Sequence, residues 1–187
     1  YDVYLQQTLF HPQGGGQPAD IGTIQGLPVS AVRQTEQGIA HTLAHALPLG
    51  PVTLQIDAER RSWHARLHSA GHLLASVAEH YGWLATKGHH WPGEARVVLQ
   101  AQADAQVLQA QPLALAVNQQ VRNALSRKVT YEQGQRHIAF EGFPARRCGG
   151  THVSNSLEIG QISITKIKLK QEQLTISYDV LSVSSDC

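Results

Sequence analysis

The chain has 187 residues, of which 42% are hydrophobic and 16% are charged, and its formal net charge is +1 at pH 7. This length can bury a core in one or two compact domains, and the presence of only two cysteines argues against a disulfide framework. The composition is that of an ordinary globular protein without a membrane-spanning stretch, and the low net charge leaves any nucleic-acid contact to a local basic patch.

Residues 1–57 predict a β-rich subdomain, because short apolar stretches alternate there with glycine and proline. Several short strands with few helical signals favour a small β-barrel or sheet. A glycine-rich turn is expected over Pro12–Pro18. The expected strands are Val3–Phe10, Thr23–Val32, Gly38–Ala46 and Val52–Ile56.

Two helices are expected next. The first begins after an N-cap at Asp57 and closes at Gly82, and the second covers Leu113–Ser126. Apolar residues at three- and four-residue steps predict one buried face on each helix. These residues are Trp63, Leu67, Ala70, Leu74 and Val77 in the first helix, and Leu113, Val117, Val121 and Leu125 in the second.

Further strands surround these helices, and the last two predict an antiparallel hairpin. In the first strand of that hairpin the apolar positions change parity between Ile164 and Ile167, which indicates a bulge. The expected strands are Glu94–Gln100, Val129–Glu132, Ile159–Leu169 and Leu174–Val183. The chain therefore predicts an α+β fold, with the β-rich part followed by a second α+β subdomain over residues 58–187.

A metal site is indicated by two pairs of candidate ligands that lie far apart in the chain. His68 and His72 lie in the first predicted helix, where four residues place both imidazoles on one face about 6 Å apart along the axis. Downstream, Cys148 and His152 flank two glycines that allow a tight turn. One thiolate with three imidazoles favours zinc over magnesium or calcium.

Other histidines and other zinc classes fit less well. His41 and His45 have the same spacing but lie in a predicted strand, where four residues span about 13 Å. His64, one turn before His68, is interpreted as a core histidine or as a partner of a ligand. Ser69 stands where a zinc protease would need its glutamate base. The two ligand pairs are also too far apart for a zinc finger.

Four motifs together resemble the editing domain of alanyl-tRNA synthetases and their free-standing relatives, the AlaX trans-editing proteins. They occur in the family's order and extend the resemblance from residue 8 to about residue 180. His11, where the family usually has tyrosine, and the two arginines before Cys148 depart from the pattern. The motifs are Thr8–Gly22, His68–Leu74, Lys87–Pro92 and Cys148–Val153.

The resemblance implies deacylation of seryl-tRNA(Ala), and of glycyl-tRNA(Ala), by a cytoplasmic protein with an α/β sandwich and a zinc site. It assigns zinc binding to His68, His72, Cys148 and His152. It also implies that Thr8 contacts the serine hydroxyl and that Gln17 and Asp20 shape the pocket.

The residues themselves leave several roles open. Asp20 is the nearest candidate base, but it is also a plausible turn cap. The backbone N–H groups of Gly14, Gly15 and Gly16 suit a ribose or an oxyanion, although a plain hairpin turn would use the same glycines. Four protein ligands would close the zinc shell, so that zinc either positions the substrate or activates water after one ligand loosens.

Basic residues give candidate phosphate contacts, with solvated surface as the alternative for each. Those that alternate on one predicted strand point to the same face. The candidates are Lys166, Lys168, Lys170, Arg60, Arg61, Arg66, Arg146 and Arg147.

The sequence therefore predicts a zinc-dependent hydrolase, a monomer or weak dimer, that acts on tRNA(Ala) mischarged with serine or glycine and not at a membrane. The alternatives are a non-catalytic, zinc-stabilised module that binds tRNA or a synthetase, an editing fragment of a larger synthetase, and a zinc amidohydrolase that acts on a small molecule.

Overall fold

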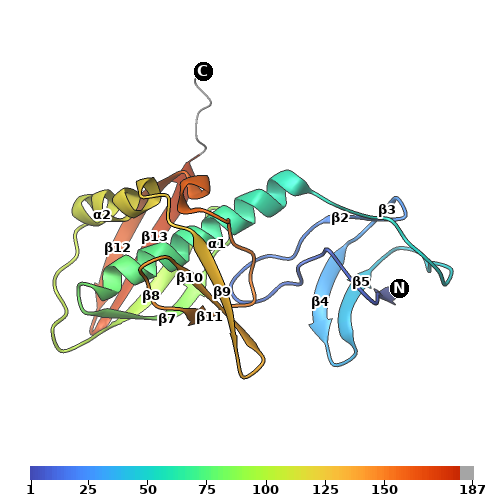
Figure 1. The fold of residues 1–187 in the computed structure, drawn as a ribbon, viewed down its shortest axis with the longest axis horizontal. Helices are drawn as coiled ribbons and strands as arrows, with labels where there is room; N and C mark the ends of the chain where they lie inside the picture. The colour runs from blue at the N-terminus through green and yellow to red at the C-terminus, as the bar shows by residue number, and fades with distance from the viewer. Residues whose placement is uncertain (182–187) are drawn as a thin grey trace, which may run out of the picture.

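The computed structural model describes residues 1–181 and has a mixed α+β fold, which confirms the predicted class (Figure 1). The N-terminal part forms two three-stranded antiparallel sheets, in the orders β1-β5-β4 and β3-β2-β6, and they enclose a small apolar cluster around Phe10, Ile24 and Leu43. The barrel-like closure, the sandwich and the domain boundary stay predictions. The strands are β1 (Asp2–Tyr4), β2 (Gly22–Ile24), β3 (Leu27–Pro28), β4 (Ala31–Thr35), β5 (Gly38–Thr42) and β6 (Leu54–Ile56).

The strands predicted in this part were too long. The strand expected over Val3–Phe10 ends at Tyr4, and the one expected over Thr23–Val32 is divided among β2, β3 and β4. The division follows from a turn at Gln25 and Gly26, whose φ angles of 50° and 76° are incompatible with a continuous strand.

Helix α1 (Ala58–Glu79) crosses the middle of the molecule. Its predicted N-cap is confirmed, because the Asp57 side chain accepts a hydrogen bond from the Arg60 backbone N–H at 2.9 Å. The buried face is confirmed for Leu67, Ala70, Leu74 and Val77. Trp63, near the N-terminal end of α1, is the exception, since it is 42% exposed.

Helix α2 (Ala110–Arg122) starts earlier and ends earlier than expected. Leu113, Val117 and Val121 form its buried stripe, whereas Leu125 lies beyond its end. The same large core contains apolar residues of α1, α2 and the four-stranded sheet.

The four-stranded sheet has the antiparallel order β12-β13-β8-β7. Its terminal hairpin is confirmed, and the predicted bulge is found as a register shift between Ile164 and Lys166. Residues 182 and 183 of the predicted last strand lie outside the described residues. The strands are β7 (Trp83–His89), β8 (Arg96–Ala101), β12 (Gln161–Lys170) and β13 (Gln173–Leu181).

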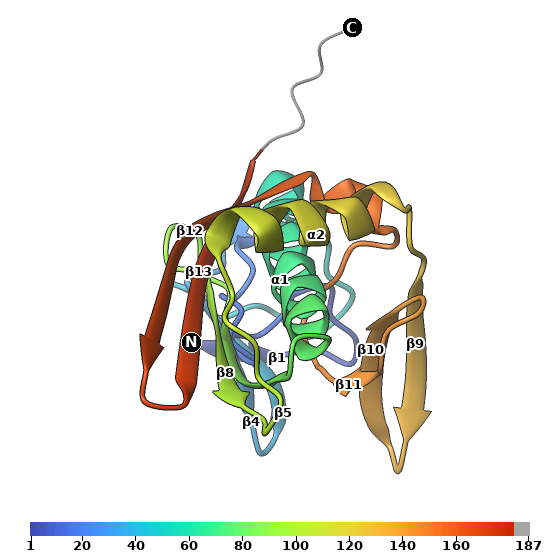
Figure 2. The same cartoon turned by 90° about the vertical axis from the view of Figure 1, so that its left-hand side faces the viewer.

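A separate three-stranded sheet, in the order β11-β10-β9, lies on the other side of α1 (Figure 2). The sequence predicted β9 but not β7, β10 or β11. A short 3-10 helix, η1 (Ser156–Ile159), follows. The strands are β9 (Arg127–Glu132), β10 (Gln135–Phe140) and β11 (Arg146–Arg147). Helix α1 is therefore held between two sheets, and its middle faces the segment that follows β11.

Candidate metal centre

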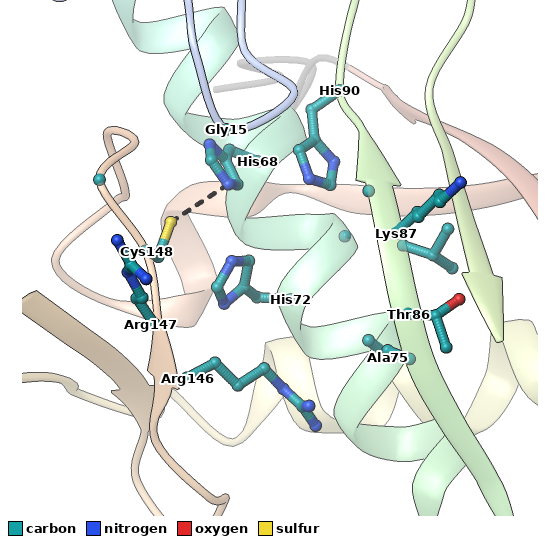
Figure 3. Close-up of a pocket in the computed structure, with 15 residues that line it drawn as sticks. Gly15, His68, His72, Ala75, Thr86, Lys87, His90, Arg146, Arg147 and Cys148 are labelled. Carbon is teal, nitrogen blue, oxygen red and sulfur yellow. Dashed lines mark hydrogen bonds between the residues drawn. The ribbon is translucent and has the colours of Figure 1, made fainter. Parts of the chain in front are cut away.

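Helix α1 supplies two of the four predicted ligands. His68 and His72 lie one turn apart with ring centroids 5.1 Å from each other. Figure 3 shows both rings and the Cys148 thiol converging on one point from the helix and from the segment after β11.

The Cys148–His152 segment supplies the other two ligands and is fixed by Arg136 of β10. The Arg136 guanidinium donates to the carbonyl oxygens of Cys148 at 3.1 Å and of Gly150 at 2.8 Å. Gly150 has to be glycine, because a Cβ at this position would overlap the ring of His68. The close approach of this backbone to α1 brings the thiol to the two helical imidazoles.

The donor atoms of His68, His72, Cys148 and His152 all lie within 4.8 Å of one another. The Cys148 Sγ atom is 3.4 Å from His68 Nε2 and 3.2 Å from His152 Nε2. Tetrahedral zinc, with bonds of about 2.0–2.3 Å, requires donor separations of roughly 3.3–3.7 Å. The donor set and its spacing therefore fit one zinc ion.

Two neighbours fix the ring tautomers that such an ion requires. Gln17 Oε1 accepts from the Thr151 backbone N–H at 2.9 Å, and lies 2.8 Å from His68 Nδ1. This amide oxygen can only accept, so the proton is on Nδ1 and the Nε2 lone pair of His68 is left for a metal. Ser69 Oγ, 3.1 Å from His152 Nδ1, can hold the second imidazole in the same way.

Burial keeps these imidazoles neutral. It lowers the pKa of His72 to about 4, with further lowering from the charges of Arg146 and Arg136. The pKa values of His68 and His152 are also well below the ordinary value, again chiefly through burial. Burial raises the pKa of the Cys148 thiol, so metal binding would have to release its proton.

A cavity of about 450 Å³ opens over the candidate metal ligands, and we call it the metal cavity. His68, His72 and Cys148 line it (Figure 3). Among the described residues, all the charged side chains that line this cavity are cationic. They are Lys87, Arg146 and Arg147. Arg146 also forms an ion pair with Glu79. The cavity therefore suits an anionic ligand that brings its reacting group close to the metal ligands.

A fourth histidine, His90, lines the metal cavity and is stacked on His68, with ring centroids 4.3 Å apart. Its Nδ1 lies 2.6 Å from the Tyr178 hydroxyl, which donates to the Leu67 carbonyl oxygen at 3.0 Å. The hydroxyl proton is thereby committed, so His90 donates from Nδ1. Burial lowers the pKa of His90 to about 3, which leaves the ring neutral.

A second cavity of about 530 Å³ contains Thr8, and we call it the Thr8 cavity. Gly15 and Gly149 line both cavities, which are therefore neighbours. Gly14 lines the Thr8 cavity as well, whereas Gly16 packs against the backbone of Gly88, where a Cβ would not fit. The glycine-rich loop thus lies between the two cavities.

The Thr8 hydroxyl has a fixed orientation. His41 Nδ1 donates to the Val3 carbonyl oxygen at 3.1 Å, so a neutral ring presents Nε2 as an acceptor. Thr8 Oγ1 lies 2.7 Å from that Nε2 and also accepts from the Phe10 backbone N–H at 3.1 Å. With its proton held by His41, the Thr8 oxygen can only accept from a ligand.

Asp20 lies apart from the metal ligands. Its carboxylate accepts from Arg61 Nε at 2.9 Å and from the His11 backbone N–H at 2.6 Å. These contacts close the glycine-rich loop at its base, as the turn-cap interpretation expects. A catalytic role for Asp20 stays a prediction, and Gln17 contacts a metal ligand rather than the open cavity.

The candidate phosphate contacts differ in their surroundings. Lys166, Lys168 and Lys170 are exposed on the edge strand β12, outside the lining of both cavities. Arg66 donates to the carbonyl oxygens of Ile159 and Leu181, which gives it a structural role.

Sequence reasoning missed the supporting residues. Ser69 was noted only because it stands where a zinc protease would have its glutamate base. No local pattern links Arg136, Tyr178 or His41 to the site. His90 lies in the weakest of the four motifs, which was its only signal. The alternative ligand pair is not assembled, since His41 is buried in β5 and His45 is exposed beyond its end.

Comparison with known proteins gives a consistent picture. A family model described as the threonyl and alanyl tRNA synthetase second additional domain matches residues 131–175, which include Cys148 and His152. The alanyl-tRNA editing protein AlaX-M of Pyrococcus horikoshii is 31% identical over 180 residues, covering 92% of this chain and 81% of AlaX-M.

Longer relatives match as well. The alanyl-tRNA editing protein Aarsd1 of Rattus norvegicus is 30% identical over 189 residues, and the chain spans 45% of its length. The alanine–tRNA ligase of Korarchaeum cryptofilum is 30% identical over 200 residues, with 22% of the ligase covered.

Within residues 1–181, neither helix is long and apolar enough to cross a membrane.

Proposed function

Since the chain belongs to the family of AlaX-type alanyl-tRNA editing proteins, we propose that it hydrolyses the ester bond of tRNA(Ala) mischarged with serine or glycine. One observation carries the proposal: the four candidate metal ligands meet at a cavity whose charged lining is entirely cationic among the described residues. Aminoacyl-tRNA combines a reactive ester with a polyanionic backbone, and this cavity is complementary to both.

His68, His72, Cys148 and His152 would hold zinc. When bound, zinc supplies a Lewis acid that can polarise a carbonyl group or lower the pKa of water. Gln17 and Ser69 act through the imidazoles, because Gln17 fixes the tautomer in which His68 Nε2 is free to coordinate and Ser69 can accept from His152 Nδ1 in the same way.

The chain's own residues position the tRNA end. Lys87, Arg146 and Arg147 contact phosphates at the metal cavity. Gly15 and Gly149 have no side chains and line both cavities, so the ester can lie between them with the amino acid toward Thr8. Lys166 and Lys168 would bind more distant phosphates.

Thr8 gives the selectivity. Its oxygen, with its proton held by His41, accepts a hydrogen bond from the serine hydroxyl. An alanyl ester offers no donor, so correctly charged tRNA cannot form this hydrogen bond and is rejected. Glycyl ester also lacks the hydroxyl, so the Thr8 contact does not separate it from alanyl ester, and we expect it to be hydrolysed more slowly than seryl ester.

The test is ester loss from seryl-, glycyl- and alanyl-tRNA(Ala) incubated with zinc-loaded protein. We expect rapid loss from the seryl ester, slower loss from the glycyl ester and no loss above buffer from the alanyl ester. Binding of tRNA without loss of any ester would instead support the non-catalytic module.

A further inference from the structure

A third pocket, of about 230 Å³, lies beside the metal centre and has no role in the function proposed above. We call it the tryptophan pocket. It contains two of the three tryptophans of the chain, and the third, Trp83, belongs to the core. Its lining residues are Pro18, Arg60, Trp63, His64, Trp91 and Pro92.

The aromatic walls of the pocket are open to solvent. Trp63 is 42% exposed, although a large apolar side chain on α1 would ordinarily be expected in the core. Trp91 is half-buried and has one face stacked on His89, with centroids 5.7 Å apart and an interplanar angle of 10°. Two indoles at one hollow offer a stacking surface for a flat ring.

The polar groups of the pocket also suit such a ligand. His64 is fully buried, and neither ring nitrogen has a hydrogen-bond partner among the described residues. Arg60 is exposed, forms no ion pair within residues 1–181 and is the single charged residue of the lining. A buried imidazole able to pair with a polar ring edge, next to a free guanidinium, is typical of nucleotide recognition.

The tryptophan pocket lies next to the metal centre. Three of its lining residues are close in the chain to residues of that centre. His64 lies one helical turn, about 5.4 Å, before the candidate ligand His68. Pro18 follows Gln17, which contacts His68, and Trp91 follows His90, which lines the metal cavity. One turn of helix is comparable to the rise of one or two stacked nucleotides, about 3.4 Å each.

We propose that the tryptophan pocket binds a base of the single-stranded CCA end of tRNA, next to the nucleotide that carries the amino acid. The base stacks on Trp63 and Trp91, its polar edge pairs with His64, and Arg60 contacts the adjoining phosphate. This inference rests on the proposed function and assigns the tRNA end a second point of attachment.

The test compares two substrates, seryl-tRNA(Ala) and 2′(3′)-O-seryl-adenosine, which lacks the neighbouring cytidines. Trp63→Ala should raise KM for seryl-tRNA(Ala) about tenfold at unchanged kcat, and change the kinetics of seryl-adenosine by less than about twofold. Trp63→Phe should recover most of the loss. The matched control is Tyr131→Ala, which removes another exposed aromatic side chain, on β9. An unchanged KM for seryl-tRNA(Ala), or an equal rise for both substrates, would overturn the proposal.

Equilibrium binding of a fluorescent CCA trinucleotide separates this inference from the proposed function. We expect the zinc-loaded protein to bind the trinucleotide, and Trp63→Ala and Trp91→Ala to weaken that binding while Tyr131→Ala does not. If the protein binds in this way but hydrolyses neither ester, the hydrolase proposal is wrong and the pocket assignment stands. If binding does not depend on the two tryptophans, the pocket assignment is wrong whatever the hydrolysis.

Discussion

The metal cavity and the Thr8 cavity share two glycines but are constructed differently. The candidate ligands at the metal cavity come from two short segments, a helix turn and a glycine turn, whose ligand spacing is visible in the sequence. The Thr8 cavity depends on Thr8 and His41, which are 33 residues apart and meet only in the folded chain. Metal chemistry is therefore encoded locally here, whereas the orientation of the candidate selectivity residue depends on tertiary structure.

The largest effect is expected from removing the thiol. Cys148→Ala should abolish stoichiometric zinc binding and ester hydrolysis together, because three imidazoles remain without the soft ligand. Zinc content per chain and hydrolysis of seryl-tRNA(Ala) are the measurements. His45→Ala, an exposed histidine outside the cluster, is the control and should leave both unchanged. Full activity in a zinc-free Cys148→Ala protein would refute the metal's role.

A smaller loss of zinc affinity is expected when a ligand loses its orienting partner. Ser69→Ala should weaken zinc binding by roughly 10–100-fold, since the serine oxygen no longer holds His152 Nδ1. Competition with a chromogenic chelator measures this affinity. An affinity within about twofold of the wild type would show that His152 needs no such partner.

The Thr8 cavity should affect selectivity rather than metal binding. Thr8→Val should lower the ratio of seryl to glycyl ester hydrolysis about tenfold and leave zinc affinity unchanged. His41→Gln should lower the same ratio, and in the double variant the two effects should not add, because His41 acts through the Thr8 hydroxyl. If the losses of seryl and glycyl ester hydrolysis were additive in the double variant, His41 would only stabilise the fold.

The close approach of the two segments should appear in stability. Gly150→Ala should lower the free energy of unfolding by about 1–3 kcal/mol, because the new Cβ overlaps the buried ring of His68. Gly149→Ala is a matched control, since its Cβ would have no atom within 4 Å. Urea unfolding of both variants measures the difference, and equal stabilities would contradict the packing described here.

The metal-free protein should become less stable in mild acid. The pKa of His72 is about 4 in the folded state and about 6.5 when unfolded, so between these values the unfolded chain binds a proton that the folded chain does not. Stability is therefore full above about pH 6.5 and declines as the pH falls toward 4. We expect the Tm of metal-free protein to fall by at least about 3 °C across this window. The slope should be smaller for His72→Gln.

The sequence was informative where local patterns decide structure. The N-cap at Asp57 and the spacing of Leu67 and Leu74 predicted α1, and the resemblance to editing domains completed the ligand set. Parity of the apolar residues also located the bulge near Ile164. In each case neighbouring residues carry the signal, so tertiary contacts were not needed.

Long-range contacts account for what could not be predicted. Strand β7 lacks a clear apolar alternation, and the partners of the site, such as Arg136 and Tyr178, are recognisable only by what they contact. Trp63 fits the helical periodicity, yet it lies outside the large core and stays exposed. Helical period alone does not show where the covering layer ends.

X-ray absorption at the zinc edge of the zinc-loaded protein tests the central claim most directly. The account predicts one sulfur at about 2.3 Å and three imidazole nitrogens at about 2.0–2.1 Å. A zinc shell without sulfur, or one with sulfur but without imidazole nitrogens, would contradict it.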